Sequence, residues 1–67
     1  MLQLTINGES RDFTRALCVA DLLVEMSLQG RRVAVERNGE IVPRGKHAET
    51  VLNNGDQLEI VVAVGGG

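Results

Sequence analysis

Residues 1–26, MLQLTINGESRDFTRALCVADLLVEM, contain a change of hydrophobic period that decides the fold class. The first apolar residues alternate with polar ones: Leu2, Leu4 and Ile6. Alternation of this kind predicts a strand with one buried face. Asn7-Gly8 then favours a tight hairpin, so residues 9–13 are expected to return antiparallel with Phe13 directed inward.

The period becomes helical after Cys18. One face collects apolar residues at helical spacing: Val19, Leu22, Leu23 and Met26. This spacing predicts a helix of about ten residues, about 15 Å long, which matches the width of a small sheet. Asp21 is expected in the first turn, where the helix dipole favours negative charge, and Gly30 is expected to end the helix. Cys18 holds the place of a Ser, Thr, Asp or Asn cap, so we expect a weak N-cap.

A second pair of strands is predicted in the middle of the chain. Val33 and Val35 alternate with polar or small neighbours and indicate a third strand. Asn38-Gly39 is a second hairpin signal, which joins this strand to a short one at residues 41–42. Pro43 is expected to end that strand, because proline cannot donate to a sheet ladder.

The remaining sequence predicts an irregular connection and one last strand. Residues 44–54 are expected to be irregular, with Val51 and Leu52 turned inward. Residues 54–56 form a turn, and residues 57–64 form the final strand. The element order predicts an α+β fold, a mixed sheet of four to five strands with one main helix packed on one face. If the first and last strands pair side by side, the fold is a ubiquitin-like β-grasp.

Length and composition limit the functional classes. A chain of 67 residues buries only about 60% of its unfolded surface, so residues 1–67 are predicted to form a single domain, with a flexible tail at residues 64–67, and to lack a deep cleft. A hydrophobic content of 43% with 24% charged residues argues against disorder. Phe13 is the single aromatic residue, which argues against base stacking. A net charge of -2 with scattered cations predicts no nucleic-acid or anionic-membrane partner.

Few side chains are candidates for chemistry. The single Cys18 excludes an internal disulfide, and the sequence offers no metal-ligand cluster. His47 lies in a polar stretch and is interpreted as solvated and not catalytic. The short basic runs 31–32 and 44–46 are interpreted as solvated charge near strand ends, with steering of an acidic partner as the alternative. No signal peptide or apolar span is visible, so a soluble cytoplasmic protein is expected.

The glycine-rich end is the main functional signal. Val64, Gly65, Gly66 and Gly67 directly follow an apolar alternating run. Without side chains, three glycines can carry the terminal group about 10 Å through a narrow channel. The Gly67 α-carboxyl has an ordinary pKa of about 3.3–3.7 and is ionised at neutral pH. Its attack on the α-phosphate of ATP would give an acyl-adenylate, from which sulfide or a persulfide could displace AMP. The sequence has no phosphate-binding glycine loop, so another protein must supply that reaction.

The final strand also predicts a docking surface. Its inward face is expected to carry three residues: Leu58, Ile60 and Val62. Val61 and Ala63 then lie on the opposite face, beside Glu59. Exposed apolar residues next to a functional tail are predicted to bind a partner.

Three segments resemble the thiamine-biosynthesis sulfur carrier proteins, ThiS. They are VERNGEIVPR at residues 35–44, the turn at residues 54–56 and the end at residues 64–67. The resemblance implies a ubiquitin-like β-grasp domain that is not itself an enzyme and binds no cofactor. It implies that Gly67 is adenylated by a ThiF-type enzyme, which uses ATP, and becomes a thiocarboxylate that donates sulfur to thiazole synthase. A desulfurase system would supply the sulfur, and residues 65–66 would occupy the enzyme's channel.

Other functions fit the same end. The small subunit of molybdopterin synthase and a ubiquitin-like protein modifier have the same kind of terminus. A plain interaction domain with an inert, frayed tail is a further alternative. An independent enzyme fits least, because no acid–base pair is visible in the sequence.

Overall fold

The computed structural model describes residues 1–63, which contain five strands, one α-helix and one 3-10 helix. Their bounds in chain order are β1 (Leu2–Ile6), β2 (Glu9–Phe13), α1 (Val19–Glu25), β3 (Val33–Arg37), β4 (Glu40–Val42), η1 (Arg44–Lys46) and β5 (Gln57–Val62). The predicted final strand is therefore shorter than expected, and the predicted flexible tail, residues 64–67, lies outside the described residues.

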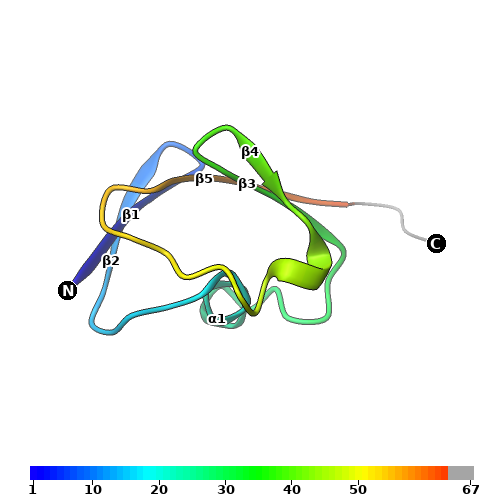
Figure 1. Ribbon diagram of the computed structural model, residues 1–67, viewed down its shortest axis with the longest axis horizontal. Helices are drawn as coiled ribbons and strands as arrows, with labels where there is room; N and C mark the ends of the chain where they lie inside the picture. Colours follow the sequence, from blue (N-terminus) through cyan, green and yellow to red (C-terminus); the bar gives the residue numbers. More distant parts are fainter. Residues whose placement is uncertain (64–67) are drawn as a thin grey trace.

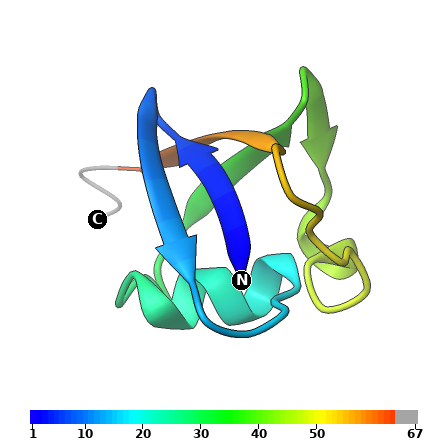
Figure 2. The same cartoon turned by 90° about the vertical axis from the view of Figure 1, so that its left-hand side faces the viewer.

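The strands form one mixed sheet in the order β2-β1-β5-β3-β4. β1 and β5 are parallel neighbours at the centre, while β1–β2, β3–β4 and β3–β5 are antiparallel. The sheet curves over α1, which lies across one of its faces (Figures 1 and 2). The predicted pairing of the first and last strands is confirmed, and with it the β-grasp architecture.

Both predicted Asn-Gly hairpins are present. Asn7 and Gly8 have φ angles of 51° and 84°, and Asn38 and Gly39 have 51° and 88°. Positive φ at both central residues gives a turn whose twist matches that of the flanking strands. Asparagine tolerates this conformation better than other side chains do, which explains its place in both turns.

The N-terminus of α1 is better capped than the sequence suggests. Cys18 is the N-cap, and its Sγ accepts from the backbone N–H of Asp21 at 3.5 Å. The Asp21 carboxylate in turn accepts from the Cys18 N–H at 3.3 Å, which completes a capping box. The Val19 and Ala20 N–H groups donate to carbonyls of the segment after η1, at 2.9 and 3.0 Å. The expectation of a weak cap is therefore wrong, because the thiol and two loop carbonyls replace a hydroxyl cap.

The helix is also shorter than the predicted ten residues. It ends at Glu25 because Ser27 adopts a positive φ of 60°, three residues before Gly30. The Leu28 N–H donates to the Leu23 carbonyl at 2.8 Å, which closes a Schellman-type end. No helix among residues 1–63 is both long and apolar enough to cross a membrane.

The core lies between α1 and the concave face of the sheet. Within residues 1–63 it consists of twelve buried apolar residues, Leu2, Leu4, Ile6, Leu17, Val19, Leu22, Leu23, Val35, Val42, Leu52, Leu58 and Ile60. The inward face predicted for β5 is confirmed, although Val62 is only half-buried. Phe13 packs against the edge of this core, as its predicted inward direction requires.

Two expectations about the segment after η1 are wrong. Leu52 is buried, but Val51 is 60% exposed. His47 is buried and not solvated, with its Nε2 3.2 Å from the Val42 carbonyl oxygen. The cause is the docking of this segment against the helix start, where the His47 and Thr50 carbonyls accept from helix N–H groups. That docking turns the imidazole inward and leaves Val51 outside.

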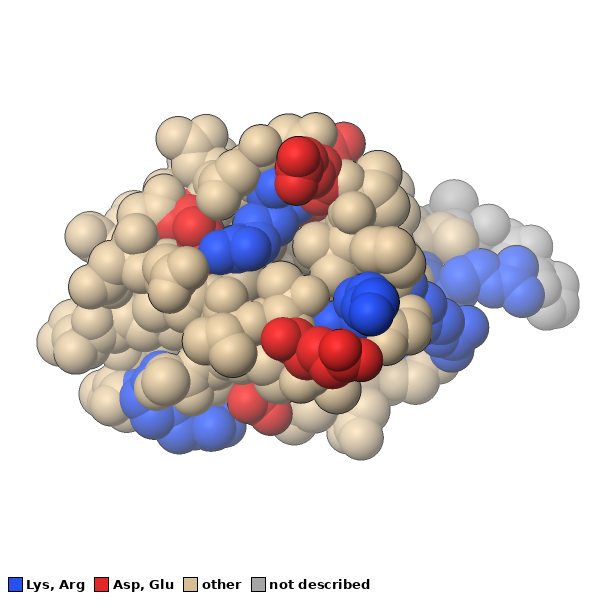
Figure 3. Space-filling view, viewed as in Figure 1, with Lys and Arg blue, Asp and Glu red and all other residues tan. Residues whose placement is uncertain are grey.

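Charged side chains of both signs are interspersed over most of the face shown in Figure 3, in line with the scattered cations of the sequence. The end of the molecule where β5 ends differs from the rest of this face, because the charged side chains seen there are basic.

Candidate functional site

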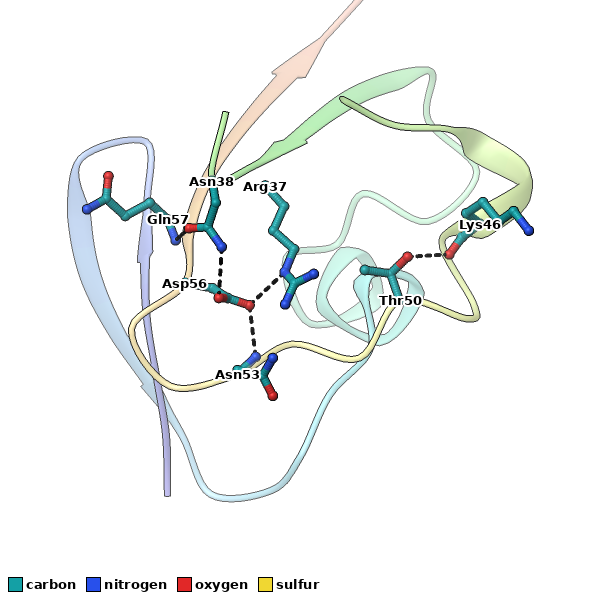
Figure 4. A network of polar contacts seen from close by, with 7 residues as sticks. All are labelled: Arg37, Asn38, Lys46, Thr50, Asn53, Asp56 and Gln57. Carbon is teal, nitrogen blue, oxygen red and sulfur yellow. Dashed lines mark hydrogen bonds and ion pairs between the residues drawn. The ribbon is translucent and has the colours of Figure 1, made fainter. Parts of the chain in front are cut away.

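The candidate site is the end of β5, and its geometry depends on how the start of this strand is fixed. Asp56, directly before β5, is only 6% exposed. Its Oδ2 accepts from the Arg37 Nε and from the Asn53 N–H, both at 2.8 Å, and its Oδ1 accepts from the Asn38 Nδ2 at 3.0 Å (Figure 4). Asn38 also binds the backbone of Gln57 in both directions, at 2.7 and 2.9 Å. The β3–β4 turn and the start of β5 are therefore joined by one carboxylate.

The ionisation of Asp56 follows from these contacts. Burial raises the pKa of this carboxyl, but hydrogen bonds from Asn53, Arg37 and Asn38 and the charge of Arg37 outweigh burial, so the pKa lies below its ordinary value of 3.8. Asp56 is consequently an anion at neutral pH and forms a partly buried ion pair with Arg37. Its role is to position β5.

The middle of β5 is bound by the side chain of Asn7, which makes backbone hydrogen bonds of the kind a neighbouring strand would make. β1 pairs with β5 only at Thr5 with Gln57 and at Ile6 with Leu58. At the next step the Asn7 amide binds the backbone of Ile60 twice, accepting from its N–H at 2.8 Å and donating to its carbonyl at 3.1 Å. The β5 ladder thus extends one step beyond β1.

The end of β5 lies beside the loop that enters β3. Val62 is the cross-strand partner of Val33. The Ala63 N–H donates to the Arg32 carbonyl at 2.8 Å, which is the last contact of the described chain. The described chain therefore ends next to the start of β3 (Figure 1).

The outer face of β5 carries the predicted docking residues. Val61 is 61% exposed, and Ala63 is exposed next to it, so the predicted face is confirmed while the binding role stays a prediction. Ala34 of β3 lies opposite Val61 and is also exposed. Ile41 of β4 is 63% exposed on the same side of the sheet. We call these four residues, Val61, Ala63, Ala34 and Ile41, the outer patch.

Sequence reasoning missed two members of the outer patch. Ala34 and Ile41 each alternate with a buried valine, and that alternation was the signal that could have identified them.

The register also puts Glu36 directly opposite Glu59, and like charges in such a pair repel. The outer patch is therefore bordered by acidic side chains.

The other predicted site residues lie outside the described residues or in structural positions. Val64, Gly65, Gly66 and Gly67 lie outside the described residues, so their roles stay predictions. Cys18 caps α1, and His47 contacts Val42, so neither adjoins the outer patch. Within residues 1–63, no group of three His, Cys, Asp or Glu side chains is arranged to hold a metal ion.

Comparisons with known proteins agree on one family. A model of the ThiS family matches residues 4–67. A thiazole synthase of Paramagnetospirillum magneticum is 50% identical over 66 residues, which cover 98% of this chain but only 20% of that protein. The sulfur carrier protein ThiS of Bacillus subtilis is 43% identical over 49 residues, covering 73% of this chain and 74% of the relative.

A solved structure supports the same relationship. The crystal structure of the thiamine biosynthesis protein ThiS from Geobacter metallireducens superposes with a TM-score of 0.83 at 33% identity, covering 98% of this chain and 100% of that chain. The structural match and the sequence matches therefore indicate the same family.

Proposed function

This chain belongs to the ThiS family, and on that basis we propose that it is a sulfur carrier protein of thiamine biosynthesis, with the Gly67 carboxylate as the group that bears the sulfur. The observation that carries the proposal is the placement of β5. This strand lies at the centre of the sheet and leads directly into residues 64–67. A central strand fixed at its start by Asp56 gives the following residues a rigid base.

The proposed chemistry uses the terminal carboxylate as a nucleophile first and as an acyl donor second. A carboxylate oxygen attacks the α-phosphate of ATP, the bond to pyrophosphate breaks, and an acyl-adenylate forms. Sulfide then attacks the carbonyl carbon and AMP leaves, which gives the thiocarboxylate. If a persulfide is the sulfur source, the resulting acyl disulfide is cleaved by a second thiol. A ThiF-type partner supplies the ATP site and a desulfurase system supplies the sulfur.

Thiazole synthase is the proposed acceptor of the sulfur. Support comes from the Paramagnetospirillum relative, a thiazole synthase that matches nearly all of this chain within one fifth of its own length. A carrier sequence and an acceptor enzyme present in one polypeptide are expected to act on each other.

The outer patch is the proposed docking surface for these partners. Val61 and Ala63 lie four and two residues before Gly65, so a partner that covers them is adjacent to the reacting end. Residues 65–66 would pass into the enzyme's channel, where the absence of side chains on glycine permits close approach. The exposed apolar area of Val61 and Ile41 supplies contact surface for a partner.

Mass spectrometry tests the proposed function. The full chain is incubated with the ThiF-type enzyme of the same genome, ATP and sulfide, and we expect a mass increase equal to replacement of one oxygen by sulfur, located at Gly67. A chain without Gly66 and Gly67 is the matched control, since it retains β5 and the outer patch. Sulfur found elsewhere, or sulfur delivery by the shortened chain, would refute the proposal.

A further inference from the structure

A second surface feature lies at the end of β5, on the helix side of the sheet. It is a half-open pocket of about 190 Å³ between α1, the loop before β3 and η1. Apolar residues and two arginines line it, among them Leu23, Val24, Leu28, Val33, Arg31 and Arg44. We call it the basic pocket.

The basic pocket adjoins the point where the described chain ends. Val33, which lines the pocket, is the cross-strand partner of Val62, and the backbone carbonyl oxygen of Arg32 accepts from the Ala63 N–H. Four further residues reach at most about 14 Å. An enzyme that holds the Gly67 carboxylate therefore has to lie against this end of the molecule.

Three arginines at this end form no ion pair within residues 1–63. The chain has seven Lys and Arg residues, and three of them form ion pairs within residues 1–63: Arg15, Arg37 and Lys46. Of the four that have no ion pair in that part of the chain, Arg11 is on β2, and the other three are Arg31, Arg32 and Arg44. These three surround the end of β5 and the basic pocket, and Figure 3 shows basic side chains gathered at this end of the molecule.

The apolar wall of the pocket adds a second requirement for a ligand. Val24 is 49% exposed although it belongs to α1, and Leu28 beside it is only half-buried. A cavity of about 150 Å³ is enough to bind benzene, so this pocket has room for one large apolar side chain. The ligand that fits is an apolar group with negative charge close by.

We propose that the basic pocket docks an acidic segment of the adenylating enzyme, one that inserts a large apolar side chain beside Val24 and places Asp or Glu against Arg31 and Arg44. The identity of this partner rests on the proposed function. Opposite charges on two faces of the carrier, acidic around the outer patch and basic around this pocket, then fix one orientation of the complex. The orientation brings the end of β5 to the enzyme.

The decisive measurement is the Kd of the full chain for the adenylating enzyme of the same genome, by isothermal titration calorimetry. We expect Arg31→Glu to weaken binding about tenfold, and the double variant Arg31→Glu with Arg44→Glu to weaken it further. Arg11→Glu is the matched control, since it makes the same change of net charge on β2 and is expected to weaken binding less than about twofold. The difference in Kd between Arg31→Glu and the unaltered chain should become smaller at high ionic strength.

A second pair of variants tests the apolar wall. Val24→Ser removes apolar surface from the pocket, and we expect it to weaken binding about fivefold. Val51→Ser is the matched control, because Val51 is a similarly exposed valine at the other end of α1. Circular dichroism melting curves of all four single variants should match that of the unaltered chain, because these side chains are exposed.

The outcomes separate this proposal from the proposed function. Equal effects of Arg31→Glu and Arg11→Glu would overturn the docking proposal, even if sulfur is still found at Gly67. Conversely, binding that depends on Arg31, with no sulfur at Gly67, would refute the carrier function and leave the docking surface in place. Failure of the unaltered chain to bind the enzyme would overturn both.

Discussion

Replacing Asp56 by Asn tests whether one carboxylate fixes the strand that leads to the glycines. The best orientation of the new amide keeps its oxygen toward Arg37 and Asn53 and turns its NH₂ toward the Nδ2 donor of Asn38. One hydrogen bond is then lost, two donors face each other, and the pair with Arg37 loses its charge. Hydrogen bonds to charged groups contribute about 1.5–3 kcal/mol, so we expect Asp56→Asn to lower the free energy of unfolding by about 2–3 kcal/mol.

A loss of this size is large for a small domain. At about 0.05–0.15 kcal/mol per residue, 67 residues have a total stability of roughly 3–10 kcal/mol. The melting temperature should fall by about 10–20 °C. Urea denaturation followed by far-UV circular dichroism is the suitable assay, because the chain has no Trp or Tyr for fluorescence.

The pH dependence gives the same prediction a second readout. The pKa of Asp56 is lower in the folded chain than in the unfolded one, so the unfolded chain binds the proton first as the pH falls. The contribution of Asp56 is therefore complete well above the ordinary pKa of 3.8 and is lost as the pH falls below that value. The stability gap between the native chain and Asp56→Asn should close in that range. A gap under about 1 kcal/mol at pH 7, or one unchanged in acid, would refute the reasoning.

Four further substitutions follow from the same contacts. Leu22→Ala removes a fully buried side chain and should cost about 2–5 kcal/mol in urea denaturation, against less than about 1 kcal/mol for Val24→Ala on the exposed side; equal losses would contradict the assigned core. Cys18→Ala should cost about 0.5–2 kcal/mol through loss of the cap, while Cys18→Ser should retain stability; equal melting curves would show that the thiol is not a cap. Asn7→Gly keeps the positive φ but deletes both bonds to β5, so a loss of about 1–2 kcal/mol is expected by urea denaturation, and no loss would remove the role given to this amide. Val61→Ser should leave stability within about 0.5 kcal/mol but weaken binding to thiazole synthase several-fold by calorimetry, and unchanged binding would exclude the outer patch.

Local patterns were sufficient for most of the fold. Alternation located β1 and β5, and each Asn-Gly pair marked a hairpin that the structure contains. The helix was placed correctly at Val19 by apolar spacing. Its end was not, because Ser27 took the left-handed conformation for which a glycine was expected.

Long-range contacts explain what the sequence did not reveal. Asp56 and Arg37 are 19 residues apart, and no local pattern relates them. His47 looked like a solvated residue in a polar stretch, yet its burial depends on backbone contacts with α1 that form only in the folded chain. The same limit applied to the basic pocket, whose arginines come together only when η1 and the loop before β3 meet.

The side chain of Asn7 determines how much of β5 is hydrogen-bonded on both of its edges. Within residues 1–63, β5 is supported on both sides as far as Ile60, by β3 and by β1 with its asparagine. Beyond that residue the strand has support from β3 alone. The point at which support from the β1 side ends, at the two Asn7 contacts with Ile60, thus limits the directions that Val62 and Ala63 can take. Loss of these two contacts would let the end of β5 change direction without any change in the residues that follow Ile60.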